Sequence, residues 1–288
     1  MMEMTELYEK YKKLLFTLAY QLTGSVADAE DAVQDVFVKF YQLNHDHLQE
    51  PKAYLCKMMT NYCYDLLKSA RWRREQYFGP WLPEPISTPD DDSFESVVRS
   101  DLLSYAMLVL LERLSPVERT IFVLREALCF DYPAIAEIVD KTEANCRKQM
   151  SRARGKMGIS EEESISNELA GEEWVQRFIA ALEQNNINSV LALLAEDVVL
   201  IADGGGKKST ATHPIQTPEH VARFLLGLFN LVSNLGENVQ IELTPLNGQT
   251  GLVVRTDGML ETVLLIHVEN NAIGSLYFVR NPDKLQHI

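Results

Sequence analysis

A short segment in the middle of the sequence concentrates basic side chains. Residues 141–156 hold six basic groups and one acid, whereas the whole chain of 288 residues has 27 basic and 41 acidic residues. A helix with a basic outer face can lie in the major groove of DNA, so we expect this segment to bind DNA. A solvated basic helix in a bundle is the alternative. The candidate contact residues are Thr142, Asn145, Arg147, Lys148, Ser151, Arg152 and Arg154.

A second basic segment lies upstream. Its polar residues are spaced 4, 3, 4 and 3 apart, which places them on one face of a helix. Cations that alternate with amide and aromatic groups suit phosphate contacts and stacking on unpaired bases. A helix with core tyrosines and solvated lysines is equally consistent with the pattern. The residues are Lys57, Asn61, Tyr64, Lys68 and Arg71, followed by Trp72, Arg73 and Arg74.

A third polar segment is acidic. Asp28, Asp31 and Asp35 share one helical face, and Gln34 lies beside them. Such a face is usually only solvated, but it can also bind a basic protein partner.

The elements that carry these residues follow from apolar spacing and local end signals. Residues 5–74 show helical periodicity, with a helix end at Gly24 and a cap at Ser25. Residues 79–95 contain four prolines around Trp81-Leu82 and predict a stiff, partly extended linker. Residues 96–157 return to helix, and Ser115–Glu118 has the residues of a capping box.

Two helices joined by a tight turn are predicted within 116–157. A short helix fits 133–139, and a longer basic helix begins at Thr142 after a turn at Asp140-Lys141. This arrangement is typical of a helix-turn-helix. The buried stripe of the longer helix is Cys146, Met150, Ala153 and Met157.

The C-terminal third predicts an α+β domain. Helices are expected at 172–184, 188–194 and 218–235, with a strand at 198–202. Alternating apolar runs then follow at 239–245, 251–256, 259–268 and 272–280, which indicate a meander of strands.

Composition limits the class of protein. Apolar residues make up 46% of the chain and charged residues 24%, which is ordinary for a folded protein. The four scattered cysteines exclude a zinc ribbon and indicate reduced thiols, and the sequence has no metal-ligand pattern. No apolar run is suited to a signal peptide or a membrane span. We therefore expect a cytoplasmic protein with no membrane partner and no cofactor. The net charge is −14, of which residues 157–288 contribute −10.

The three polar segments, taken in order, resemble a bacterial RNA polymerase sigma factor of the extracytoplasmic-function class. The matching segments are DAEDAVQDVFVKFYQ, YLCKMMTNYCYDLLKSARWRRE and SPVERTIFVLREALCFDYPAIAEIVDKTEANCRKQMSRARGKM. The resemblance implies that Asp28, Asp31 and Asp35 dock on the clamp helices of core polymerase. It implies that the segment from Lys57 to Arg74 melts the −10 element and that the helix from Thr142 recognises the −35 element of promoter DNA. Asn145 and Gln149 depart from the usual recognition helix.

Three further motifs resemble the sigma-factor group with a fused SnoaL-like domain. They are Trp81-Leu82-Pro83-Glu84-Pro85, Asp203-Gly204-Gly205-Gly206-Lys207 and Asn281-Pro282-Asp283-Lys284-Leu285. The resemblance implies a C-terminal cone of the ketosteroid-isomerase superfamily that regulates the sigma factor in cis. We expect Trp81-Leu82 to meet the other two motifs. The expected organisation is a helical domain at 1–76, a linker at 77–98, a helix-turn-helix domain at 99–160 and the cone at 161–288.

Other functions remain open at this point. A helix-turn-helix regulator that binds duplex DNA alone would leave Lys57–Arg74 without a role. An isomerase or cyclase would need an acid and a histidine in the cone, for which Asp203, His213, Asp257 and His267 are the candidates, but no spacing demands a dyad. The cone could also bind an unknown small molecule as a sensor.

Overall fold

The computed structural model describes residues 4–42, 51–75, 77–88, 103–160, 171–234 and 239–288, and the chain divides into two compact units. The first unit contains residues 1–75, 91–103 and 107–166, and the second contains residues 76–90, 104–106 and 167–288. The sequence linker therefore belongs to the same unit as the C-terminal domain as far as residue 90. Residues 89–98 of the expected linker and residues 99–102 of the expected helix-turn-helix domain lie outside the described residues.

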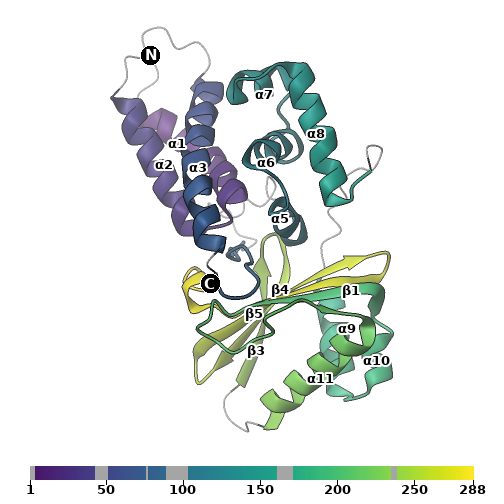
Figure 1. Ribbon diagram of the computed structural model, residues 1–288. Helices are drawn as coiled ribbons and strands as arrows, with labels where there is room; N and C mark the ends of the chain where they lie inside the picture. The colour runs from purple at the N-terminus through teal and green to yellow at the C-terminus, as the bar shows by residue number, and fades with distance from the viewer. Residues whose placement is uncertain (1–3, 43–50, 76, 89–102, 161–170, 235–238) are drawn as a thin grey trace. The chain divides into compact units, whose positions relative to one another are not determined.

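The first unit begins with three packed helices, α1 (Met4–Thr23), α2 (Val26–Tyr41) and α3 (Pro51–Glu75) (Figure 1). Gly24 has a φ of 69°, a left-handed conformation that ends α1 without a Cβ penalty. Ser25 caps α2 by accepting a hydrogen bond from the Asp28 amide, as predicted. One face of α2 is buried, and its members are Val26, Ala29, Ala32, Val33, Val36, Phe37 and Phe40.

The helix-turn-helix is also present in this unit. It follows α5 (Tyr105–Leu111) and consists of α6 (Pro116–Phe122), η1 (Val123–Ala127), α7 (Tyr132–Val139) and α8 (Glu143–Met157). The predicted capping box of Ser115 and Glu118 is confirmed, and Asp140 makes the turn before α8 with a left-handed φ of 55°. The predicted stripe of α8 is confirmed, since Cys146, Met150, Ala153 and Met157 are all buried.

The two helical parts of the first unit pack directly on one another. The buried Arg119 of α6 donates one hydrogen bond to the Leu22 carbonyl of α1 over 2.6 Å and another to Glu112 over 2.5 Å. Helix α3 lies against α6 and α7, where Lys52 covers the Phe130 ring at 4.5 Å.

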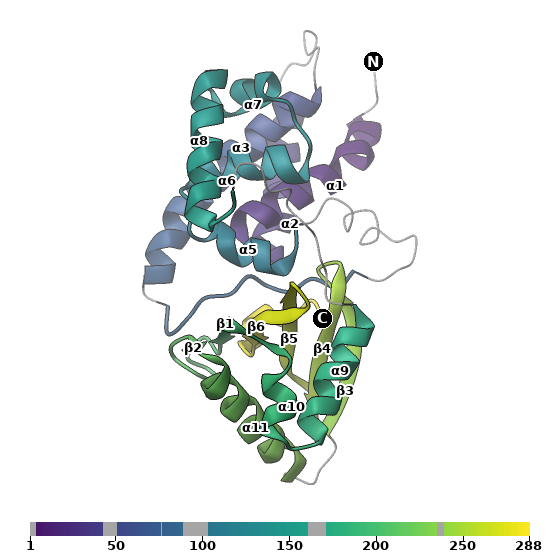
Figure 2. The ribbon, with the colours of Figure 1, turned by 90° about the vertical axis from the view of Figure 1, so that its right-hand side faces the viewer.

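The second unit is a six-stranded mixed sheet with helices on one face (Figure 2). The strand order is β2-β1-β6-β5-β4-β3, all antiparallel except for the parallel pair β1–β6. The strands are β1 (Leu194–Asp203), β2 (Ile215–Gln216), β3 (Val239–Leu246), β4 (Gln249–Thr256), β5 (Met259–Glu269) and β6 (Ala272–Val279). The helices are α9 (Glu172–Glu183), α10 (Ile187–Leu191) and α11 (Pro218–Asn234), and the short η2 (Pro282–Lys284) follows β6.

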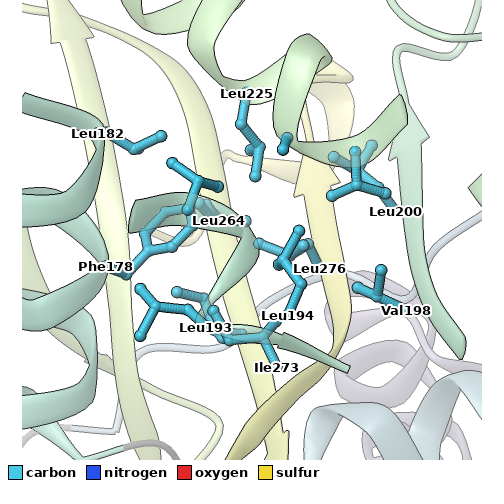
Figure 3. Packing of buried hydrophobic residues seen from close by; sticks show 14 of the residues in the cluster. Phe178, Leu182, Leu193, Leu194, Val198, Leu200, Leu225, Leu264, Ile273 and Leu276 are labelled. Atoms are coloured by element: carbon cyan, nitrogen blue, oxygen red, sulfur yellow. The ribbon is translucent and has the colours of Figure 1, made fainter. Parts of the chain in front are cut away.

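The core of this unit lies between the helices and the sheet. Phe178 and Leu182 of α9 and Leu225 of α11 pack on the inner face of β5 and β6, including Leu264 and Leu276 (Figure 3). The predicted fold class of two helical modules followed by an α+β domain is confirmed. The predicted strand at 198–202 was too short, because β1 already begins at Leu194, where the sequence had indicated the end of a helix. No helix among the described residues is long and apolar enough to cross a membrane.

Candidate functional site

The acidic residues of α2 lie on its outer face. Asp31, Gln34 and Asp35 are exposed and Asp28 is half-buried. The Tyr62 hydroxyl of α3 donates a hydrogen bond of 2.8 Å to the Asp35 carboxylate. Burial and this hydrogen bond raise the pKa of Tyr62 to about 12. Asp35 is therefore held in place, while Asp31 is available to a basic partner.

The predicted stripe on α3 is only partly exposed. Asn61 and Lys68 are exposed, Lys57 is half-buried, and Lys68 forms a surface ion pair with Asp65 at 3.0 Å. Tyr64 departs from the expectation of a freely accessible base-stacking ring, because its hydroxyl is closed off from solvent beside α6. Burial raises the pKa of Tyr64. The side chains of Arg71, Trp72, Arg73 and Arg74 lie outside the described residues.

Helix α8 presents most of its predicted contact residues to solvent. Thr142 caps the helix by accepting a hydrogen bond from the Asn145 amide, and Arg147 lies 4.1 Å above the Tyr132 ring of α7. Exposed residues on this face include Asn145, Arg147, Lys148, Ser151 and Arg152.

Arg154 is a correction to this predicted face. Its guanidinium is 13% exposed and pairs with Glu126 of η1 at 2.8 Å, and it also donates a hydrogen bond to the Ser160 carbonyl. These partners hold Arg154 against its own module. This pairing could not be predicted from the sequence, because the position of Glu126 depends on the tertiary fold.

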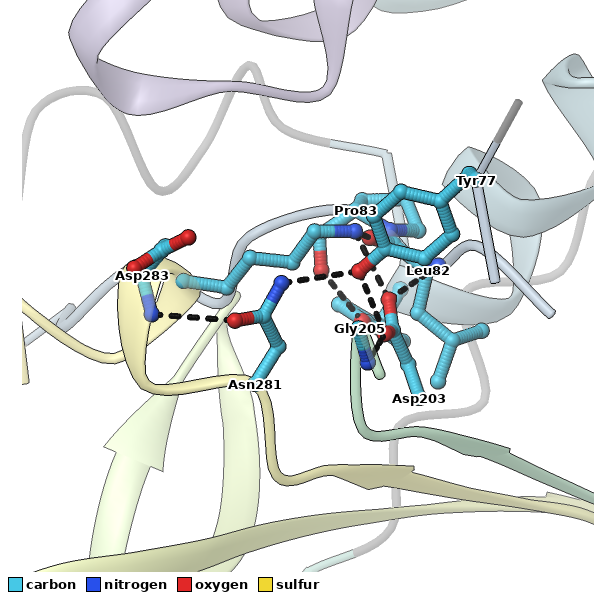
Figure 4. Close-up of polar contacts among 9 residues, drawn as sticks. Tyr77, Leu82, Pro83, Asp203, Gly205, Asn281 and Asp283 are labelled. Atoms are coloured by element: carbon cyan, nitrogen blue, oxygen red, sulfur yellow. Dashed lines mark hydrogen bonds and ion pairs between the residues drawn. The ribbon is translucent and has the colours of Figure 1, made fainter. Parts of the chain in front are cut away.

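A densely connected polar site lies at the end of β1. Asp203 has no exposed surface, and its carboxylate accepts hydrogen bonds from the Tyr77 hydroxyl at 2.6 Å and the Leu82 amide at 2.9 Å (Figure 4). The Lys284 ammonium lies 2.7 Å from the same carboxylate and donates a second hydrogen bond to the Leu82 carbonyl. We call Asp203, Asn281 and Lys284 the linker-binding site.

Aromatic rings of the linker cover the lysine. The Lys284 ammonium lies 4.0 Å from the centre of the Trp81 ring and 4.9 Å from that of Tyr77, which are favourable cation–π distances. Asn281 donates a hydrogen bond of 2.8 Å to the Tyr77 hydroxyl. Burial and the bond to Asp203 raise the pKa of Tyr77. The expected contact of Trp81-Leu82 with the Asp203 and Asn281 motifs is present in the structure.

Glycine is required in the turn after Asp203. A Cβ on Gly204 would lie 2.3 Å from the Lys208 carbonyl oxygen, and a Cβ on Gly205 would lie 2.4 Å from the Asn281 side chain. Gly205 also donates its amide to the Asp203 carboxylate at 3.0 Å. The remaining motif residues contribute less, since Lys207 and Asp283 form an exposed ion pair of 2.6 Å. Gly206 lies next to Phe78, and Pro282 begins the short η2 helix.

A second attachment of the linker was not predicted. The Ile86 amide donates to the Asn247 side chain at 3.0 Å, and the Thr88 amide donates to the Pro245 carbonyl at 2.9 Å. The buried Tyr105 donates its hydroxyl to the Pro83 carbonyl at 2.6 Å and packs its ring on Tyr277 of β6. Only the short polar hairpin turn at Asn247-Gly248 marks this attachment in the sequence, and such turns are too common to identify it.

The candidate catalytic residues are not brought together. Asp203 is held by the linker. Its hydrogen-bond partners among the described residues do not include His213, Asp257 or His267. His267 has Glu269 as its ion-pair neighbour, at 3.9 Å. Among the described residues, no group of histidine, cysteine and acidic side chains could hold a metal ion.

Comparison with known proteins agrees with this geometry. Family models for Sigma-70 region 2 and Sigma-70 region 4 match residues 7–73 and 104–157. The extracytoplasmic-function (ECF) RNA polymerase sigma factor SigJ of Mycobacterium tuberculosis is 34% identical over 98% of this chain and 93% of its own length. The crystal structure of that SigJ matches with a TM-score of 0.79 and 31% identity over 98% of both chains. A probable ECF sigma factor, SigI, of the same species is 30% identical over 65% of each chain.

The order of the two matched regions defines the class of protein. A region 2 followed by a region 4 is the make-up of a sigma factor, a transcription initiation factor that acts with RNA polymerase on promoter DNA. The chain belongs to the ECF family of RNA polymerase sigma factors.

Proposed function

We propose that the second unit regulates this sigma factor in cis by binding the linker between its two DNA-binding modules. The supporting observation is the buried Asp203 carboxylate, which is bound by Tyr77 and Leu82 of the linker and by Lys284. Because the regulator and linker share one chain, their effective concentration is on the order of millimolar, and weak contacts are enough to keep the linker bound. On this proposal the second unit has no catalytic role.

The separation of promoter elements supplies the physical reason for such regulation. The −10 and −35 elements are about 25 base pairs apart, or roughly 85 Å at 3.4 Å per base pair. Helices α3 and α6 touch one another in the first unit, and Arg119 joins α6 to α1. The modules must therefore separate to contact both elements. The linker is the segment that has to allow this separation, so binding it at 77–88 restrains the change.

The surfaces of the first unit receive roles on the same basis. We assign Asp31, with Asp28, Gln34 and Asp35, to the contact with core polymerase. We assign the face of α8 that includes Arg147, Lys148 and Arg152 to the −35 element. We assign to the −10 element the residues Lys57, Asn61 and Lys68 of α3, followed by Arg71–Arg74. Tyr64 contacts the same element only after α3 separates from α6. We further propose that the protein acts in the bacterial cytoplasm, because core polymerase and promoter DNA are located there.

A reversible crosslink tests the regulation directly. A Cβ on Gly206 would lie 3.3 Å from the Phe78 Cβ, slightly below the range of about 3.5–4.5 Å in a disulfide, so a small shift of the turn, where Gly206 has a left-handed φ of 72°, would allow the bond. We expect the full chain carrying Phe78→Cys and Gly206→Cys to form this disulfide and to direct little run-off transcription by core polymerase. Reduction should restore transcription, because it frees the linker again.

Two variants control this experiment. Lys284→Met removes the buried ammonium and should raise transcription, whereas Lys207→Met removes only an exposed ion pair and should leave it unchanged. Equal transcription by the oxidised and reduced crosslinked proteins would show that linker binding has no regulatory effect. Unchanged transcription by the Lys284→Met protein would contradict the proposal independently of the crosslink.

A further inference from the structure

A cavity of about 370 Å³ lies between α9, α11 and the inner face of the sheet. Its deep part is lined by apolar residues that include Phe178, Leu225, Leu264 and Phe278. Toward the start of β3 the lining includes Ile241 and Leu231, which are 44% and 59% exposed. This volume is within the range of sites that bind small organic molecules. The cavity is separate from the linker-binding site, whose residues do not line it.

The polar groups of the cavity gather at one end of the sheet. Glu261, Thr262 and Arg280 line this end, where β5 begins and β6 ends. Thr262 pairs with Val254 and Leu260 pairs with Arg255, so Glu261 is the extra residue of a β-bulge. A bulge turns successive side chains toward the same face, which explains why both Glu261 and Thr262 reach the cavity.

The charges at this end are unequal. The Glu261 carboxylate lies 2.9 Å from the Lys208 ammonium and 3.6 Å from the Arg280 guanidinium. Two cations therefore share one carboxylate. Arg280 donates one hydrogen bond, from Nη1 to the Ser209 carbonyl, and its buried Nε has no partner among the described residues. An arginine in these surroundings has donors left for an acidic ligand group.

We propose that this cavity binds an apolar carboxylic acid, with its carboxylate at Arg280 and its hydrocarbon part among Phe178, Leu225 and Leu264. The apolar lining favours a hydrocarbon, and the excess cation favours one negative charge over a neutral or positive head group. The proposal concerns binding alone and does not depend on the regulation proposed above.

Calorimetric titration of the full chain tests it with three probes of one chain length, the two ionic probes below their micelle concentrations and the alcohol below its solubility limit. We expect dodecanoate to bind at one site per chain, and dodecan-1-ol and dodecylammonium to bind at least tenfold more weakly. Arg280→Gln should weaken dodecanoate at least tenfold, because it removes the charged donor. Arg255→Gln is the matched control. Arg255 lies between the cavity residues Val254 and Thr256 on β4, so its side chain is on the other face of the sheet, where it pairs with Glu242.

A second variant keeps the test decisive if Arg280→Gln does not fold. Leu228→Trp fills the cavity from a half-buried position on α11 and leaves Arg280 in place. It should abolish dodecanoate binding. Equal affinity for dodecanoate and dodecan-1-ol, undiminished binding by the Leu228→Trp protein, or no binding by the unaltered chain would each overturn the proposal.

Discussion

Polar contacts from several segments of the second unit converge on Asp203. Its carboxylate binds a tyrosine, a backbone amide and a lysine, and its own carbonyl accepts the amides of Arg280 and Asn281 at 2.7 and 3.0 Å. A buried carboxylate is tolerable only with such partners, because desolvation of an unpaired charge costs several kcal/mol. Asp203 thus ties the linker, β1 and the segment after β6 together.

Asp203→Asn should destabilise the second unit strongly. The substitution keeps the shape of the side chain but leaves the Lys284 ammonium, 7% exposed, without its counter-charge. We expect a loss of about 3–5 kcal/mol in the free energy of unfolding, and partial recovery when Lys284→Met is added. Urea denaturation measures both. The exposed pair provides the comparison, since Lys207→Met should cost less than about 1 kcal/mol.

Two arginines of α8 that are two residues apart, and so lie on different sides of the helix, should respond differently to truncation. Arg152 is exposed, so we expect its side chain to contact a DNA phosphate. Arg152→Ala should then reduce by about 1 the magnitude of the slope of log affinity against log salt concentration, measured for the holoenzyme on one promoter. Arg154→Ala should leave that slope unchanged and destabilise the first unit by about 1–3 kcal/mol, because Glu126 loses its partner. A reduced slope for Arg154→Ala would return this residue to the DNA-binding face.

At the scale of single elements, α6 is held at its start by charges as well as by its cap. Glu118 is buried at this capping box, accepts the Ser115 amide at 2.8 Å and pairs with Lys156 of α8 at 2.7 Å. Burial opposes ionisation of Glu118, but the bonds from Lys156 and Ser115 outweigh it and lower its pKa. The charged form therefore stabilises the fold.

The stability of the helix-turn-helix should depend on pH through this residue. Because the pKa of Glu118 is lower in the folded state than in the unfolded state, where it is about 4.5, its charge stabilises the fold above that pH. This stabilisation is lost as the pH falls through the folded-state pKa. Glu118→Gln should cost about 1 kcal/mol at pH 7 and much less in acid. Urea unfolding of both proteins at pH 7 and below pH 4 measures this. A constant difference between them would contradict the assignment.

Elements with strong local signals could be predicted from the sequence. The spacing of Cys146, Met150, Ala153 and Met157 identified the buried side of α8, and Ser115–Glu118 identified the start of α6. The linker contact was predictable only through the resemblance of its motifs to a sigma-factor group. The burial of the Tyr64 hydroxyl and the ion pair of Arg154 with Glu126 were not predicted, because these surroundings come from elements distant in sequence, to which periodicity is insensitive.

At the scale of the whole molecule, hydrogen exchange should report the attachment of the linker. The amides of Leu82, Ile86 and Thr88 donate to Asp203, Asn247 and Pro245, so we expect all three to be protected in the full chain. Lys284→Met should release Leu82 and leave Thr88 protected, because the two attachments are separate. Simultaneous loss at both positions would show that the linker binds as one cooperative piece.

The distance in sequence between the partners of the linker-binding site has a consequence for newly made protein. Leu82 and Lys284 are 202 residues apart. At about 5–20 residues per second, the ribosome needs roughly 10–40 s to add the lysine after the leucine. Both DNA-binding modules emerge during that interval, while the linker still lacks its partner. Each new chain therefore passes through an interval in which its linker is not bound at Asp203 and Lys284, and the number of such chains rises with the rate at which the cell synthesises the protein.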